Sequence, residues 1–421
     1  MSVLSLRGGK NISQTALMLL GGLCWIPAGG ATLDIEAVFT ADSAAPQKNE
    51  FVNKTPSRGF CELLPKVCRQ EGVFSLRAPI EFVASAPVRA HHADPRQGGM
   101  AKVPSAWRDV TVTHSSGETR VVKVRIAGIA HDARIPVSIE ELTGQGGIRG
   151  WDSLWQGGGW ANAPAPCQGI GPYTITSTHS YRSYWKVPVA AGMCSKQALF
   201  DIPMSFQYRD IEFGYQLITP DPLSMQSGKY HGSITFSVGP GQDFDMGDVM
   251  QPSDPLLTLN FALDVQHTLK VDIPPGGERL ELVPAGGWQS WLQAGRKPVR
   301  LFRDQTFHIS ASSRFKMYYE CEAWVTFDCT IKDAVGRRQV ELQVGVSLPG
   351  GLTDLSGQPV KHQRLRAGPE NAQVFQPGFY VDRAPGVLHF EVSKDEVDWM
   401  LSSNVQSPYS GRVTVIWDSE V

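Results

Sequence analysis

The feature that most constrains this sequence is an alternating strand pattern that it contains twice. The first copy is YHGSITFSV, at 230 to 238, and the second is YSGRVTVIWD, at 409 to 418, which begins 179 residues later. In each copy a tyrosine, a glycine and then apolar residues occupy every second position, which is the period of a strand with one buried face. A strand that recurs at this distance predicts two domains of one type, each ending on the same element.

Strand-like segments also run along the rest of the chain. TLDIEAVF at 32 to 39, VFSLRAPIEF at 73 to 82 and the segment 109–129 alternate or are rich in β-branched residues. The 42 glycines and 29 prolines, without long helical periodicity, are typical of a turn-rich all-β chain. We therefore expect two immunoglobulin-like β-sandwich domains.

The first 31 residues have a different character. Arg7 and Lys10 precede an apolar run from Ala16 to Ile26, and small residues follow up to Ala31. This order is typical of a secretory signal peptide, spanning 1–31 and cleaved after Ala31. The run is shorter than the roughly 20 residues of a membrane span. The sequence therefore predicts an exported protein.

The domain boundary is expected where periodicity disappears. The segment 239–256, GPGQDFDMGDVMQPSDPL, contains turn residues and acids but no strand or helix period. The expected division is an N-terminal domain at 32–240, a linker at 241–255 and a C-terminal domain at 256–421.

Six cysteines remain after the signal peptide, which contains Cys24. An even number in an exported chain indicates disulfides, and six cysteines allow 15 connectivities. Sequence order suggests three local bridges: Cys61–Cys68, Cys167–Cys194 and Cys321–Cys329. A zinc site is the alternative, but the spacing lacks CxxC pairs, so we expect no metal.

Charge and motifs exclude several functions. The net charge is −2 and the pI is about 6.6, so no basic field is present to hold nucleic acid. No G-x-S-x-G nucleophile elbow occurs, and DFDMGD at 243–248 lacks the closing glutamate of a calcium loop. We expect neither an enzyme nor a bound cofactor.

Aromatic and cationic residues are concentrated among glycines between 149 and 186. Aromatic faces can bind the apolar side of sugar rings, and cations can bind hydroxyls or carboxylates. The alternative is that the aromatic residues belong to the sandwich core. The candidate receptor-binding residues are Arg149, Trp151, Trp155, Trp160, Tyr181, Arg182, Tyr184 and Trp185, with Arg182 and Trp185 the leading choices.

Several motifs together resemble a known family. They are FVNKTPSRGFCELLPKVC near the mature N-terminus, YHGSITFSV, SRFKMYYEC, and LHFEV followed by YSGRVTVIWD. With the export signal and the cysteines, they resemble chaperone–usher pilus subunits. The two-domain form is similar to the tip adhesins and minor pilins of the alternate family, which builds colonization-factor and cable pili.

The resemblance implies that the C-terminal domain is an incomplete pilin sandwich lacking one strand. Its last strand would border a groove that a periplasmic chaperone, and later the adjoining pilin, fills with a donor strand by donor-strand complementation. The implied groove residues are Tyr409, Gly411, Val413, Val415 and Trp417. The short segment before the first strand is expected to leave little room for a donor strand of its own. Subunits of this kind pass through the periplasm and the outer-membrane usher to the pilus tip at the cell surface.

Three functions remain open at this point. The first is a tip adhesin that binds a host-surface glycan or glycoprotein through its N-terminal domain. The second is a tip pilin that initiates assembly at the usher without a receptor. The third is a secreted carbohydrate-active enzyme, which would need paired acids where Asp152 stands nearly alone.

Overall fold

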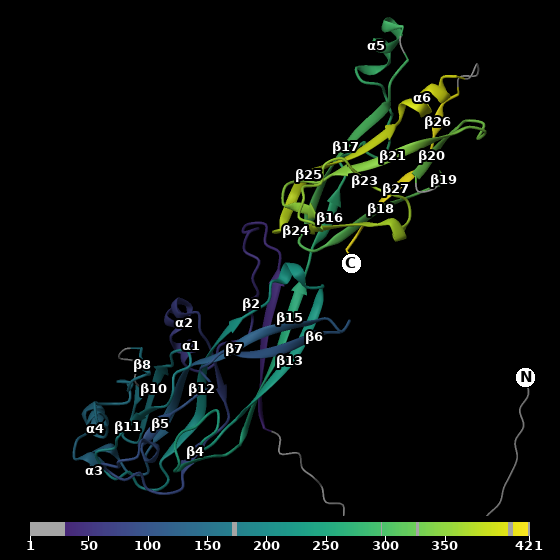
Figure 1. Ribbon diagram of the computed structural model, residues 1–421. Coiled ribbons are helices and arrows are strands. Elements are labelled where there is room, and N and C mark those ends of the chain that lie inside the picture. The colour runs from purple at the N-terminus through teal and green to yellow at the C-terminus, as the bar shows by residue number, and fades with distance from the viewer. Residues whose placement is uncertain (1–29, 171–174, 296, 326–327, 403–406, 420–421) are drawn as a thin grey trace, which may run out of the picture.

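The computed structural model describes residues 30–170, 175–295, 297–325, 328–402 and 407–419. The expected signal peptide lies outside these residues except for Gly30 and Ala31. The chain is all-β, with short helices at the edges of its sheets (Figure 1). None of the described helices is long and apolar enough to span a membrane.

Two large hydrophobic cores organise the chain, and a third, smaller cluster around Phe60 and Tyr184 lies beside the first. The first is formed by residues between Ile35 and Val265, and the second by residues between Leu301 and Val397. No named sheet contains strands from both groups. We refer to residues 30–266 as the first region and to residues 269–419 as the second region.

The first region is built on one large sheet, whose main path runs β14-β4-β12-β7-β6-β13-β15-β1-β2. β1 and β15 alternate between buried and less buried residues, so one face covers the core, whereas β12 is buried continuously from Ile211 to Tyr215. The strands are β1 (Ala31–Thr40), β2 (Val52–Asn53), β3 (Phe74–Ala78), β4 (Phe82–Ala84), β5 (Gly99–Ala101), β6 (Arg108–His114), β7 (Thr119–Arg134), β8 (Gln168–Gly169), β9 (Ile175–Thr176), β10 (Ser180–Lys186), β11 (Cys194–Lys196), β12 (Gln207–Ile218), β13 (Gly228–Ser237), β14 (Met250–Pro252) and β15 (Leu256–Gln266). The helices are α1 (Phe60–Leu63), α2 (Pro65–Glu71), α3 (Ile139–Thr143) and α4 (Gly147–Ser153), with 3-10 turns η1 (Pro95–Gln97) and η2 (Pro222–Ser224).

The boundary between the regions corrects the expected division at 32–240, 241–255 and 256–421. β15 pairs in parallel with β1 and antiparallel with β13, so it completes the first sheet rather than beginning the second (Figure 1). The segment expected as a linker is also part of the first core, since Phe244, Asp245 and Met250 are completely buried. In the sequence of this segment, turn residues separate the few apolar residues, so no strand or helix period indicates that the segment is buried. The connection between the regions is only His267 and Thr268.

The second region is a sandwich of two sheets. One has the order β16-β17-β25-β21-β20-β19 and the other β22-β24-β18-β27. The two sheets share one buried core. The sheet that contains β17 contributes Phe307, Val344 and Leu388, and the sheet that contains β18 contributes Phe315 and Met317. The strands are β16 (Leu269–Asp272), β17 (Leu301–Ala311), β18 (Phe315–Cys321), β19 (Trp324–Val325), β20 (Asp328–Asp333), β21 (Gln339–Ser347), β22 (Leu352–Asp354), β23 (Gln363–Arg364), β24 (Gln373–Pro377), β25 (Val381–Val392), β26 (Tyr409–Ser410) and β27 (Val413–Asp418). The helices are α5 (Gly287–Ala294) and α6 (Lys394–Met400), with a 3-10 turn η3 (Pro369–Asn371).

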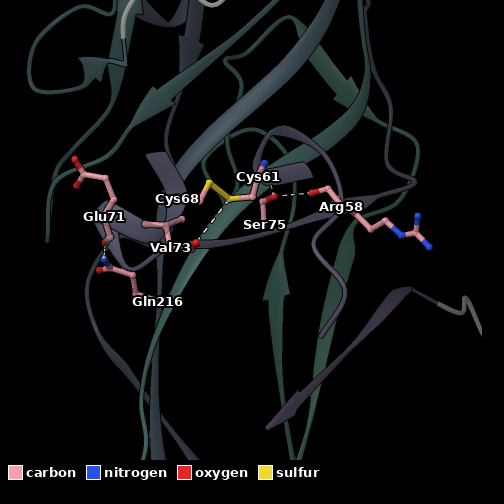
Figure 2. The surroundings of a disulfide bond; sticks show 7 residues. All are labelled: Arg58, Cys61, Cys68, Glu71, Val73, Ser75 and Gln216. Atoms are coloured by element: carbon pink, nitrogen blue, oxygen red, sulfur yellow. Dashed lines mark hydrogen bonds between the residues drawn. A yellow bond between two sulfur atoms is a disulfide. The ribbon is translucent and has the colours of Figure 1, made fainter. Parts of the chain in front are cut away.

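The three predicted disulfides are confirmed: Cys61–Cys68, Cys167–Cys194 and Cys321–Cys329. Figure 2 shows the first, which joins α1 to α2 beside β3. The Cys61 N–H donates to Ser75 Oγ at 3.0 Å, and Ser75 Oγ donates to the Arg58 carbonyl at 2.6 Å. Each bridge closes a short loop within one region, so the disulfides stabilise local structure and leave the two regions covalently joined only through the chain.

Candidate functional site

The aromatic residues proposed for receptor binding are core residues. Trp151, Trp155, Trp160, Tyr181, Tyr184 and Trp185 are all buried, none more than 6% exposed. The rings of Trp160 and Trp185 stack at 4.5 Å, and Trp185 Nε1 donates to the Trp160 carbonyl at 2.6 Å. In this structure no face of these rings is open to a sugar. This corrects the sequence interpretation, because Tyr181, Tyr184 and Trp185 are buried on strand β10, and the turns around Trp155 and Trp160 fold their rings inward.

Asp152, the acid considered for glycoside chemistry, has a structural contact. Its Oδ1 accepts a hydrogen bond from the Gly159 N–H at 3.1 Å. The nearby Lys196 is buried and donates to the carbonyls of Gly159 and Asn162, at 2.9 and 2.6 Å. Burial lowers the pKa of Lys196 to about 8, with Asp152 opposing that shift. These contacts hold the 159–162 turn in place.

The cationic candidates differ from the aromatic ones because they reach the surface. Arg149 is exposed on α4. Arg182 on β10 forms an ion pair with Glu212 on β12, and Arg77 on β3 binds the same oxygen, Glu212 Oε1, at 2.8 Å. The Glu212 side chain is only 5% exposed, whereas that of Arg77 is 42% exposed. Two guanidinium groups around one carboxylate leave a local positive charge on this face of the sheet.

Sequence reasoning found Arg182 but missed Arg77 and Glu212. Arg77 is 135 residues from Glu212, and the three residues meet only because β3 and β10 flank the pair of strands β12 and β7. Nothing in the local pattern around Arg77 distinguishes it from an ordinary exposed strand residue.

A groove runs along the second region and has a volume of about 1180 Å³. All five residues predicted from the terminal strand contribute to its lining. Its floor is formed by inward side chains of the larger sheet: Leu301, Leu342, Leu388 and Phe390. The opposite wall is the segment 277–282. The structure therefore places the five predicted residues along an apolar groove. That a donor strand fills this groove stays a prediction.

The terminal strand forms one wall of this groove and leaves one edge open. β27 pairs antiparallel with β18, from Lys316↔Asp418 to Cys321↔Val413, and has no second partner strand among the described residues. Val413, Val415 and Trp417 point to the core but are only half-buried. The Trp417 ring contacts Phe307 edge to face at 5.5 Å. Apolar side chains and an unpaired backbone edge are thus exposed together.

The opposite wall is an interrupted strand. The ladder between β16 and β17 ends at Asp272↔His308, and the chain then bulges through 273–277. It rejoins β17 where Val283 and Phe302 exchange backbone hydrogen bonds of 3.2 and 3.0 Å. A Cβ at Gly277 would lie 2.7 Å from Gln305 Nε2, so a residue without a side chain permits this close approach. Leu280 and Leu282 line the groove from this wall.

One end of the groove is bordered by α5, which projects from the end of the second region remote from the first region (Figure 1). Trp288 and Leu292 lie one helical turn apart and both line the groove, although Leu292 is 78% exposed. Met400 and Leu401 lie on the groove from the α6 side. Sequence analysis missed this helix, since GGWQSWLQAG is short and bounded by glycines.

No protein-family model and no curated protein matches this chain. The chain is similar to CfaE, the adhesive subunit of CFA/I fimbria of enterotoxigenic Escherichia coli, with 9% identity, 92% of each chain covered and a TM-score of 0.26. It is similar to a chain of a chaperone–tip adhesin complex of CFA/I fimbriae biogenesis, with 9% identity, coverage of 93% and 97%, and a TM-score of 0.22.

A third match is the CsuC–CsuE chaperone–tip subunit complex from the archaic chaperone–usher Csu pili of Acinetobacter baumannii. Its identity is 8%, its coverage is 92% of this chain and 97% of that chain, and its TM-score is 0.19. All three structures include an adhesive or tip subunit of fimbriae or pili. At these identities and TM-scores the function of this chain rests on its own residues.

Proposed function

We propose that the chain is a pilus tip adhesin assembled by the chaperone–usher pathway. In this proposal the second region takes a donor strand, first from a periplasmic chaperone and then from the adjoining pilin at the outer-membrane usher. The single observation that carries the proposal is the groove between β27 and the segment 277–282, which exposes core side chains beside a half-paired strand.

A donor strand would correct both defects of this groove. Its backbone would pair with the open edge of β27, and alternating apolar side chains would cover Val415, Leu388 and Phe390. Covering apolar surface contributes roughly 25 cal/mol for each Å² removed from water, so a strand several residues long would stabilise the second region by several kcal/mol. An ordinary complete sandwich has no comparable vacancy.

The test is to fuse a donor segment to the full chain after Val421 through a Gly/Ser linker. The donor is the N-terminal extension of the adjoining pilin. Calorimetry should show the transition of the second region rising by on the order of 10 °C. A donor with its alternating apolar residues changed to serine is the matched control and should have no effect. The proposal would be contradicted if the chain without a fused donor is monomeric and if fusing the donor leaves its unfolding temperature unchanged.

For the first region, we propose that Arg182 and Arg77 bind an acidic group on a host-surface glycan. Guanidinium groups form charge-assisted, often bidentate hydrogen bonds with carboxylates and sulfates. Arg182→Ala should weaken binding to acidic glycans about tenfold, because one such bond is lost, without changing the melting temperature by more than a few degrees.

The matched control is Arg89→Ala, because Arg89 also pairs with an acid, Asp201, at 3.0 Å but lies elsewhere on the surface. A glycan array that shows no binding by the donor-fused chain would favour the pilin that initiates assembly without a receptor. Equal binding by Arg182→Ala and the unmodified chain would place the receptor site elsewhere.

A further inference from the structure

The face of the second region opposite the groove carries a serine, a histidine and an aspartate joined by hydrogen bonds. His389 on β25 lies between Asp304 on β17 and Ser347 at the end of β21. His389 Nδ1 is 2.8 Å from Asp304 Oδ1, and His389 Nε2 is 2.8 Å from Ser347 Oγ. With the Nδ1 proton donated to the carboxylate, Nε2 is free to accept the serine hydroxyl. This is the order of contacts that activates a nucleophilic serine.

Strand register brings these residues together. Asp304 and His389 are direct partners in the β17–β25 ladder, and Gly345 is the partner of His389 in the β21–β25 ladder, two residues before Ser347. Leu388 and Phe390, the neighbours of His389 in the chain, line the groove, so alternation directs the imidazole to the other face. No nucleophile-elbow motif is involved, because each residue comes from a different strand.

His362 makes two further contacts with this set. Its backbone N–H donates to Ser347 Oγ at 2.8 Å. Its ring stacks on the His389 ring, with centroids 4.0 Å apart and an interplanar angle of 22°. The φ of His362 is +50°, a conformation that residues other than glycine seldom adopt and that is enriched at functional sites. His362 thus places an N–H at the serine and covers one side of the imidazole.

The alternative is that these contacts only brace the sheet, as cross-strand polar pairs commonly do. If these residues only stabilised the sheet, any set of cross-strand hydrogen bonds would serve, and the histidine would not need to lie between the aspartate and the serine. Here the imidazole has its two nitrogens divided between a carboxylate and a hydroxyl, and its side chain is only 13% exposed while that of Asp304 is 56% exposed. The histidine is therefore mostly shielded from water and oriented toward the serine.

We propose that Ser347 is a nucleophile that cleaves esters of small acyl groups carried on larger, solvent-exposed molecules. Ser347 Oγ attacks the ester carbonyl carbon as its proton passes to His389 Nε2. The bond to the alcohol oxygen then breaks, and the alcohol leaves with that proton, which gives acyl-Ser347. A water molecule, deprotonated by the same nitrogen, attacks the acyl carbon; the released acid departs, and Ser347 recovers its proton.

The surroundings determine this substrate class. The site lies on the side of the sheet opposite the groove, where Asp304 is 56% exposed although His389 is 13% exposed, and this suits an acyl group projecting from a large molecule rather than a small free substrate. The His362 N–H donates to Ser347 Oγ in the free chain and would have to turn to the substrate carbonyl oxygen as the oxyanion develops. One such donor stabilises the oxyanion less than a pair would, so an ester, with its better leaving group, is the expected substrate rather than an amide.

The test is covalent labelling of the full-length chain with an alkyl fluorophosphonate, which phosphonylates activated serines with loss of fluoride. Peptide mass spectrometry should find one adduct, on Ser347. Ser347→Ala should abolish it, and Asp304→Asn, which keeps the side-chain shape, should slow it at least tenfold. Ser356→Ala is the matched control and should label normally, because Ser356 Oγ is exposed and donates directly to the Asp354 carboxylate at 2.7 Å, with no histidine between them.

A folded chain whose Ser347 stays unlabelled would overturn the proposal. So would labelling that proceeds equally in the Asp304→Asn and His389→Gln variants while their melting temperatures match that of the unmodified chain. This proposal does not depend on the pilus function, since the groove and the triad lie on opposite faces of one sheet.

Discussion

The two copies of the repeated strand have different surroundings, although their sequence patterns are nearly the same. β13 in the first region hydrogen-bonds to β15 through ten residue pairs and to β6 on its other side. The second copy, expected as one strand, is split: β26 pairs with β20 of the larger sheet, and β27 pairs with β18 alone among the described strands. Tyr230 and Phe236 on β13 are buried, whereas Val415 and Trp417 on β27 are only partly covered. The alternating pattern specifies which face is apolar but not how many strands will cover it.

The largest difference should appear when a charge is placed in each strand. Phe236→Asp puts a carboxylate into the completed first core, where Phe236 contacts Phe244 edge to face at 5.8 Å. Losing the ring and burying a charge should cost more than about 4 kcal/mol and unfold the first region. The loss should be the same with or without a fused donor strand. Circular dichroism melts of both forms would measure it, and rescue of Phe236→Asp by the donor would show that the first core is also open.

In the open strand the same kind of substitution should act mainly on the donor. Val415→Asp should remove the stabilisation by a fused donor and lower the affinity for the chaperone about 100-fold, because the carboxylate is buried only when the groove is filled. Thr414→Asp is the matched control, since Thr414 is the exposed neighbour that points away from the groove. The measurements are calorimetry of the fused chain and chaperone pull-down. If the Val415→Asp and Thr414→Asp chains bind the donor equally, Val415 does not line the groove that the donor fills.

Sequence patterns predicted the features that depend on neighbouring residues. The bridges Cys61–Cys68 and Cys321–Cys329 and the inward row of β27 were found because each lies within a short segment, and Cys167–Cys194 followed from the order of the remaining cysteines. The boundary was missed, because Phe244 and Met250 anchor a segment without any period. The aromatic residues were misjudged because glycines around Trp160 indicate turns but do not tell whether a turn folds inward.

Long-range contacts were beyond the reach of one sequence. Arg77 meets Glu212, and His389 meets Asp304 and Ser347, only after strands far apart in the chain take their register. Register is set by the whole sheet, so no local signal marks these residues. The sites that carry charge or chemistry were therefore the least predictable part of this molecule.

The smallest effect is expected at the joint between the closed and the open region. His267 Nε2 donates to the Met225 carbonyl of the first region at 2.9 Å, and Nδ1 lies 3.2 Å from Ser312 Oγ of the second region. Burial lowers the pKa of His267 below its usual value, although the hydrogen bond to Met225 opposes the shift.

Because the pKa of His267 is lower in the folded chain than in the unfolded chain, the unfolded chain takes up a proton first as the pH falls. The stabilising contribution is complete above the unfolded value, about 6.5, and is lost below it. Between pH 7.5 and 5.5 the donor-fused chain should lose less than about 1 kcal/mol through this group. His267→Gln should reduce that loss, because glutamine keeps a donor for the Met225 carbonyl but does not titrate. His231→Gln, on an exposed histidine of β13, should leave the loss unchanged. Calorimetry at the two pH values measures the difference, and an identical pH dependence in the His267→Gln chain would show that the joint does not sense protonation.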